Sequence, residues 1–97
     1  MANSIINPFA QIGKSVILNS SCVVEHDCIV GDYCHISVNT TLYGTAQIGN
    51  QCFIGANATI KNNTTVHNNC MIGMGSVVLR DIKEAGSYVG VPAKRIK

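Results

Sequence analysis

Two histidines and three carboxylates lie together in one short stretch of the sequence. His26 stands between Glu25 and Asp27, and Asp32 and His35 follow within nine residues. A carboxylate beside an imidazole can hold one tautomer of the ring and make it more basic, which a general base working near neutral pH requires. This stretch is therefore a candidate catalytic site, and His26 is the candidate base.

The other residues that could take part in catalysis or metal binding are weaker candidates than this stretch. His67 is followed by Asn68 and Asn69, which is typical of a solvated turn. The five cysteines include no Cys-x-x-Cys pair of the kind that holds zinc. We therefore expect no metal site.

A repeat of six residues indicates the elements that must position this stretch. From residue 6 to residue 78, every sixth residue is Ile, Leu or Val. The thirteen positions are Ile6, Ile12, Leu18, Val24, Val30, Ile36, Leu42, Ile48, Ile54, Ile60, Val66, Ile72 and Val78. The residues four positions after each of these aliphatic residues form a second column, and most of them are small. A helix has an apolar spacing of 3.6 and a simple strand one of 2, so neither explains one large and one small inward residue in every six.

A triangular solenoid does explain the repeat. Each hexad would supply one short side and one corner, and three hexads would make a coil of 18 residues whose neighbours stack about 4.8 Å apart. The sequence therefore predicts an all-β parallel β-helix of about four coils over residues 1–83, followed by a C-terminal tail over residues 84–97.

The residue after the aliphatic is the expected corner. It is often glycine, as at Gly13, Gly49 and Gly55, or asparagine, as at Asn7 and Asn19. Both types tolerate a positive φ, so we expect the chain to turn at this position. The Asn-x-Ser/Thr triplets are attributed to the same corners, because nothing in the sequence marks a glycosylated, secreted protein.

All five cysteines fall in the small inward column. We expect them to fill the core, with raised pKa values and low reactivity. Parallel side chains on stacked strands suit disulfide geometry poorly. The residues are Cys22, Cys28, Cys34, Cys52 and Cys70.

Composition excludes several classes of function. The net charge of the 97 residues is only +2, which argues against a nucleic-acid partner. The chain has no apolar run of the roughly 20 residues that span a membrane, and its start has no signal-peptide pattern, so we expect a cytoplasmic protein. Five of the seven basic residues lie in the last 18 positions, where an anion would bind.

Several motifs resemble those of a known group of enzymes. Residues 25–28, 31–32, 35–37 and 42–44 (Glu-His-Asp-Cys, Gly-Asp, His-Ile-Ser and Leu-Tyr-Gly) resemble the active-site region of bacterial sialic-acid O-acetyltransferases and nucleotide-amino-sugar N-acetyltransferases. Residues 90–94 resemble the Gly-x-Pro-Ala-Lys element of acetyl-CoA-dependent members. The repeat resembles the hexapeptide pattern of the left-handed β-helix acyltransferases, so the resemblance implies a left-handed coil.

The resemblance also implies roles for particular residues. His26 would be the general base, and Asp27 the acidic neighbour that tunes it. His35 would help to position the acceptor or the thioester, and Asn19 occupies the place of a supporting amide. The backbone N–H of Gly44 would stabilise the developing oxyanion.

Substrates and assembly follow from the same resemblance. It implies acetyl-CoA as co-substrate, a sugar or nucleotide-sugar acceptor, and a homotrimer whose active sites lie between subunits. Whether an amino or a hydroxyl group is acetylated stays open. Full-length relatives carry an N-terminal nucleotide-binding α/β domain, to which nothing in this sequence corresponds.

A path for acetyl-CoA can be read from the length of the coil. Val38, Ala56 and Met74 should form a column beside which the pantetheine arm could run. The glycines next to this column, Gly55, Gly73 and Gly75, should allow close approach. The path leads to the C-terminal element, whose candidate cofactor-binding residues are Gly90, Pro92, Lys94 and Arg95, the last two for the nucleotide phosphates.

Two other functions compete with acetyl transfer. A carbonic anhydrase on the same solenoid needs three histidines around one metal, but His26, His35 and His67 occupy three different places in the repeat. A structural or partner-binding solenoid with no catalysis is the other alternative.

Overall fold

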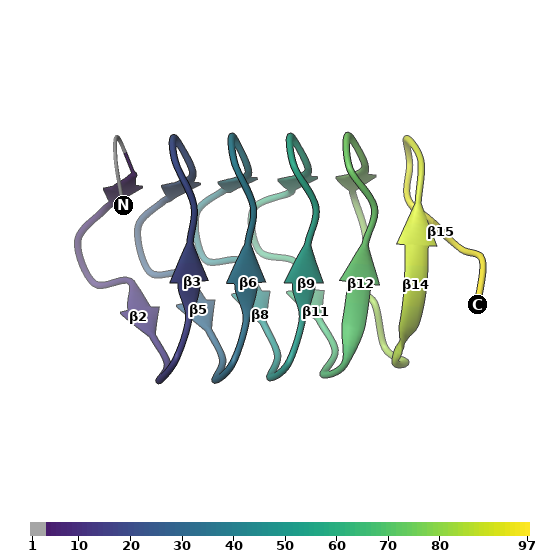
Figure 1. Ribbon diagram of the computed structural model, residues 1–97, viewed down its shortest axis with the longest axis horizontal. Helices are drawn as coiled ribbons and strands as arrows, with labels where there is room; N and C mark the ends of the chain where they lie inside the picture. Colours follow the sequence, from purple (N-terminus) through teal and green to yellow (C-terminus); the bar gives the residue numbers. More distant parts are fainter. Residues whose placement is uncertain (1–3) are drawn as a thin grey trace.

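The computed structural model describes residues 4–97, so Met1, Ala2 and Asn3 of the predicted β-helix lie outside the described part. The described chain contains short strands and no helix, and it winds into a triangular prism, which confirms the predicted β-helix (Figure 1). Figure 1 shows the chain advancing from left to right while the front strands run upward and the chain then turns to the back. This is a left-handed coil.

Three parallel sheets form the faces of the prism. Face A consists of β1 (Ile5–Ile6), β4 (Val23–Val24), β7 (Thr41–Leu42), β10 (Thr59–Ile60) and β13 (Val77–Val78). Face B consists of β2 (Gln11–Ile12), β5 (Ile29–Val30), β8 (Gln47–Ile48) and β11 (Thr65–Val66). Face C consists of β3 (Ile17–Leu18), β6 (His35–Ile36), β9 (Phe53–Ile54), β12 (Cys70–Ile72), β14 (Gly86–Val89) and the antiparallel β15 (Lys94–Arg95).

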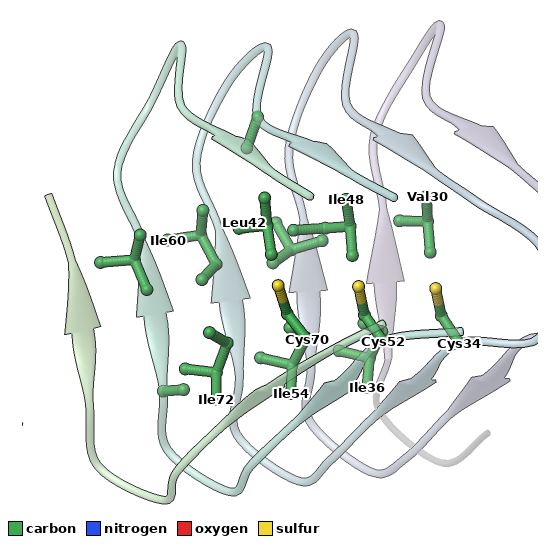
Figure 2. Close-up of a cluster of buried hydrophobic side chains, with 14 of the residues drawn as sticks. Val30, Cys34, Ile36, Leu42, Ile48, Cys52, Ile54, Ile60, Cys70 and Ile72 are labelled. Atoms are coloured by element: carbon green, nitrogen blue, oxygen red, sulfur yellow. The ribbon is translucent and has the colours of Figure 1, made fainter. Parts of the chain in front are cut away.

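From β1 to β13, neighbouring strands on each face are three hexads apart in the sequence, as the repeat predicts. Val24 pairs with Leu42, and Leu42 pairs with Ile60. The second residue of each two-residue strand from β3 to β13 points inward and is buried, whereas the first residue points outward. Since every inward aliphatic lies directly above another, the core is a set of continuous apolar columns (Figure 2). This burial stabilises strands that would be too short to form alone.

The corners turn at a different residue from the one predicted. Positive φ occurs at the third residue after the aliphatic, at eleven non-glycine positions with φ between 55 and 64°. The glycines that directly follow the aliphatic residue are required for a different reason, because the next coil leaves no room for a side chain there. A Cβ on Gly49 would lie 2.7 Å from the backbone N of Asn68, and one on Gly55 would lie 2.7 Å from the backbone N of Met74. The next coil thus excludes a side chain at this position.

The solenoid continues beyond residue 83. Ile82 bridges to Val66, and β14 pairs in parallel with β12, so that the prism has about five coils where thirteen hexads predicted about four. β15 then folds back along β14 and ends face C. Cys70 pairs with Gly86 and not with Tyr88, the residue one full coil later, so β14 lies outside the hexad register.

The cysteines fill the core as predicted, and all five are free. Figure 2 shows Cys34, Cys52 and Cys70 in one row with their sulfurs aligned. Burial raises the pKa of Cys28 and of Cys70. The thiols of Cys34 and Cys52 interact across the stack. This interaction raises the pKa of Cys52 and lowers the pKa of Cys34 to about 7, so the prediction of a raised pKa is wrong for Cys34. Cys34 is nevertheless only 1% exposed, which keeps the thiol away from solvent.

Candidate active site

His26 lies on the prism edge where faces A and B meet, in the corner between β4 and β5. The next residue, Asp27, has a φ of 59°, a conformation that Asp adopts more readily than most residues. This turn brings one oxygen of the Asp27 carboxylate to 3.2 Å from His26 Nδ1. Both side chains are more than half exposed, so the pair adds little to stability. Its effect is to orient the ring.

Gly44 lies one coil further along the same edge, directly against the His26 ring. A Cβ on Gly44 would come within 2.6 Å of His26 Nε2, so only glycine leaves room for the ring in this position. Among the described residues, no group accepts a hydrogen bond from the Gly44 N–H. The His26 ring therefore lies against a residue whose backbone N–H is available as a donor.

His35 lies on β6 with its side chain on the outside of face C. Asn19 Nδ2 lies 2.8 Å from His35 Nε2, so the predicted supporting amide contacts this histidine. If the amide donates this bond, a neutral ring carries its proton on Nδ1. The Phe53 ring packs edge-on against the imidazole with 5.0 Å between centroids. His35 is thus held on both sides, whereas His26 is exposed.

The structure does not bring the two histidines together within one chain. His26 lies on the edge between faces A and B, and His35 lies on face C, which is opposite that edge in a triangular prism. Face C is turned to the viewer in Figure 1, and the corners between faces A and B lie behind it. The predicted catalytic residues therefore form two half-sites on one chain: His26, Asp27 and Gly44 on the edge, and His35 with Asn19 on the face.

Val38, Ala56 and Met74 form the predicted column, which lies on the edge between faces C and A. The Asn57 N–H donates to the Val38 carbonyl over 2.9 Å, and the Gly75 N–H donates to the Ala56 carbonyl over 2.8 Å, which stacks these corners. Met74 ends the column and is 80% exposed.

The glycines beside this column differ in what surrounds them. Gly55 and Gly73 are needed for contact with the next coil of the same chain, not with a ligand, since Cβ atoms there would meet Met74 and Val89. The space around Gly75 is open, because a Cβ there would meet nothing within 4 Å.

The C-terminal element caps the prism next to this column. The Gly90 N–H donates to Ser76 Oγ over 3.0 Å, and the Ala93 N–H donates to the Val77 carbonyl over 2.8 Å. Gly90 has a φ of 101°, which favours glycine, and Pro92 follows a cis peptide bond. The segment from Gly90 to Ala93 is therefore fixed against the last strand of face A.

The basic end of the chain lies around a cavity of about 570 Å³ at the C-terminal end of the prism. Arg95 donates to the Glu84 carboxylate over 3.2 Å and to the carbonyls of Ala85 and Lys97, so its guanidinium is already engaged. Lys94 lines the same cavity and forms no ion pair with any described residue. Of the two predicted phosphate-binding residues, Lys94 is the one with an uncommitted charge.

Sequence reasoning missed several neighbours of these sites. Phe53 follows His35 by one full coil and pairs with it, so the coil length could have revealed their contact. Arg80 and Lys83 belong to the basic last 18 residues where an anion was expected to bind, but their place beside Lys94 in the cavity was missed, because the hexads end in this part of the chain.

Residues 4–97 contain no group of three or more His, Cys, Asp or Glu side chains that could hold a metal ion. The same part of the chain forms no helix long and apolar enough to cross a membrane.

Comparison with solved structures finds acetyltransferases. The acetyltransferase domain of PglB from Neisseria gonorrhoeae, in complex with acetyl coenzyme A, is 30% identical with a TM-score of 0.84, over 99% of this chain and 53% of that one. PerB from Caulobacter crescentus, in complex with CoA and GDP-perosamine, is 26% identical with a TM-score of 0.85, over 98% of this chain and 55% of that one. Serine acetyltransferase from Neisseria gonorrhoeae is 31% identical with a TM-score of 0.88, over 95% of this chain and 40% of that one.

The chain thus spans about half the length of the PglB acetyltransferase domain and of PerB. The bacterial transferase hexapeptide (six repeats) model matches residues 9–44 and again residues 45–80, which together make up most of the chain. The first of these two matches includes every residue of both half-sites. The chain belongs to the bacterial transferase hexapeptide family.

Proposed function

We propose that this chain transfers acetyl from acetyl-CoA to an amino or hydroxyl group of a sugar or nucleotide sugar. The observation that carries the proposal is the arrangement of His26 between Asp27 and Gly44. The similar structures that hold acetyl-CoA, or CoA with GDP-perosamine, support both the co-substrate and the class of acceptor.

His26 can act as the general base in this arrangement. When its Nδ1–H donates to Asp27, the lone pair is on Nε2, on the side of Gly44. Acetyl-CoA supplies the acyl group as a thioester. His26 Nε2 takes the proton of the acceptor amine or hydroxyl as that atom bonds to the thioester carbon, and it returns the proton to the sulfur when the carbon–sulfur bond breaks. Protons and electron pairs balance over the two steps.

Gly44 would stabilise the charge that develops in this reaction. Its N–H has no acceptor among residues 4–97 and can donate to the carbonyl oxygen as that oxygen becomes negative. A donor that is already in place costs no reorganisation when the charge appears.

A second copy of the chain would complete the site. His26 and His35 lie on opposite sides of the prism, so His35 and Asn19 of one subunit can assist His26 only in a neighbouring subunit. If the edge of each prism packs against a face of the next one, a closed homotrimer would repeat this contact in all three interfaces. The column Val38, Ala56 and Met74 would then border the cleft between subunits, where acetyl-CoA binds.

Lys94 would bind the phosphates of acetyl-CoA, and Arg95 would hold the C-terminal strand through Glu84. Lys94→Ala should weaken binding of coenzyme A more than binding of dephospho-coenzyme A, since a lysine acts as a point charge on phosphate. An equal loss for both ligands in calorimetry would show that Lys94 does not contact the 3′-phosphate.

Two measurements on the purified protein test the proposed function. Calorimetry should detect binding of acetyl-CoA, which a structural solenoid without activity would not bind. Release of CoA should then be followed with a panel of amino sugars, nucleotide sugars and serine, because serine acetyltransferases are also similar to this chain. Turnover of serine alone would replace the sugar with serine as the acceptor, and binding without any turnover would contradict an enzymatic role.

A further inference from the structure

Exposed aromatic side chains flank His26 along its edge of the prism. Tyr43 lies in the coil after His26 and is 45% exposed, and Phe9 lies in the coil before it and is 81% exposed. Both coils stack on the corner of His26: the Thr45 N–H donates to the His26 carbonyl over 3.0 Å, and the Asp27 N–H donates to the Pro8 carbonyl over 3.3 Å. The two aromatic residues are therefore two coils apart, roughly 9 to 10 Å along the axis, with His26 between their levels.

The backbone of Tyr43 is fixed, but the side chain is uncommitted. Its N–H donates to the Ile60 carbonyl over 3.0 Å, and its carbonyl accepts from the Ala46 N–H over 3.1 Å and from Cys28 Sγ over 3.1 Å. Its hydroxyl has no hydrogen-bond partner among the described residues. Such a residue presents an aromatic ring from a rigid support, which is how a positioning residue is best held.

The residue after Tyr43 lies against His26. Gly44 follows Tyr43 and has no side chain, and the three atoms nearest to the position of a Cβ on Gly44 all belong to the ring of His26. An acceptor whose nucleophile reaches His26 Nε2 would therefore lie level with Gly44 and beside Tyr43.

We propose that Tyr43 binds the acceptor by stacking against the apolar C–H face of a pyranose ring, and that Phe9 borders the other side of the same subsite. The inference rests on the proposed function and narrows its acceptor to a ring. An aromatic face adds both buried apolar area and the attraction of its negative π-surface for the slightly positive C–H groups. A small acceptor such as serine has no ring to stack, so Tyr43 would favour a sugar over serine.

The chain offers a matched control for Tyr43. Tyr33 is also an exposed corner tyrosine, but it lies on the edge between faces B and C, away from His26. Tyr43→Ala should raise the KM of the amino-sugar acceptor about three- to tenfold, the range that one aromatic contact provides. The KM of acetyl-CoA should stay the same. Tyr43→Phe should stay within about twofold of wild type, and Tyr33→Ala should match wild type.

A binding measurement separates this inference from the proposed function. In NMR spectra of the amino sugar with the wild-type protein, the ring C–H protons should shift upfield because of the Tyr43 ring current, and Tyr43→Ala should remove the shift. If the shift is present but no acetyl is transferred, the proposed function fails and the stacking stands. If Tyr43→Ala leaves the shift and the acceptor KM unchanged, the stacking is wrong. If Tyr43→Ala raises the KM of both the acceptor and acetyl-CoA and dissociates the oligomer, Tyr43 contributes to subunit packing instead. Turnover of serine alone would also overturn the inference.

Discussion

His26 depends on one neighbour along the chain and another in the next coil. The Asp27 carboxylate lies 3.2 Å from Nδ1, and Gly44 leaves room for the ring on the side of Nε2. Gly44 follows His26 by one full coil of the repeat, so the length of the coil explains why the two residues stack. The turn at Asp27 was not predicted, because a positive φ was expected at glycine and asparagine directly after the aliphatic.

Replacing His26, the proposed general base, should lower activity far more than replacing another exposed histidine. His26→Ala should lower kcat by about 10² to 10⁴, the usual contribution of a positioned general base, and binding of acetyl-CoA should survive. His67→Ala is the control, since His67 is exposed and only its Nδ1 contacts a neighbouring carbonyl. Steady-state kinetics should show near wild-type turnover for His67→Ala. If His26→Ala keeps more than half of wild-type turnover, the base has been assigned to the wrong residue.

Two glycines of the same repeat should respond differently to alanine. In Gly44→Ala the new Cβ meets the exposed His26 side chain, which can move, so activity should fall while the melting temperature changes little. In Gly49→Ala it meets the backbone of Asn68, which cannot move away, so stability should fall by about 1–3 kcal/mol. Thermal unfolding and CoA release measure the two effects. Equal losses of stability would mean that Gly44 is required only for packing.

At the scale of the strands, the hexad register carries most of the fold. It predicts the buried, inward residue of every strand from β3 to β13, because each coil repeats the contacts of the coil before it. β14 and β15 could not be predicted in this way, since the repeat ends before them and their place depends on contacts such as Tyr88 Oη to the Glu84 carbonyl. The lowered pKa of Cys34 was not predicted for a similar reason, because it depends on a contact with the Cys52 thiol in the next coil.

The inward and outward positions of the strands should differ sharply in tolerance. Ile54→Asp places a charge at a fully buried position, and the cost of several kcal/mol is comparable to the whole stability of a small domain, about 5–15 kcal/mol. Ile29→Asp is the matched control, because Ile29 points outward and is 38% exposed. Circular dichroism on heating should show Ile54→Asp unfolded or strongly destabilised and Ile29→Asp close to wild type. Similar melting temperatures for the two variants would contradict the solenoid register.

At the scale of the whole molecule, one chain carries both halves of the proposed site but cannot join them. The edge with His26 and the face with His35 point in opposite directions, so assembly decides whether the halves meet. The sequence predicted one candidate site around both histidines, which are nine residues apart, but their separation across the prism depends on which face or edge each of them occupies.

The mass of the particle in solution tests whether the chain forms a trimer. Sedimentation should give a particle of three chains of 10.3 kDa, about 31 kDa, because closed cyclic symmetry is the usual form of such oligomers. A monomer of full activity would exclude a site that two chains share.

Subunit mixing tests the shared site most directly. His26→Ala and His35→Ala chains, each with its own affinity tag, should be produced together, and trimers carrying both tags should be purified and compared with each parent. If the edge of one chain meets the face of the next around a closed ring, every mixed trimer has both histidines intact at one of its three sites. Mixed trimers should therefore recover about a third of wild-type activity, well above either parent. If mixed trimers of confirmed composition are no more active than their parents, the site does not form between chains.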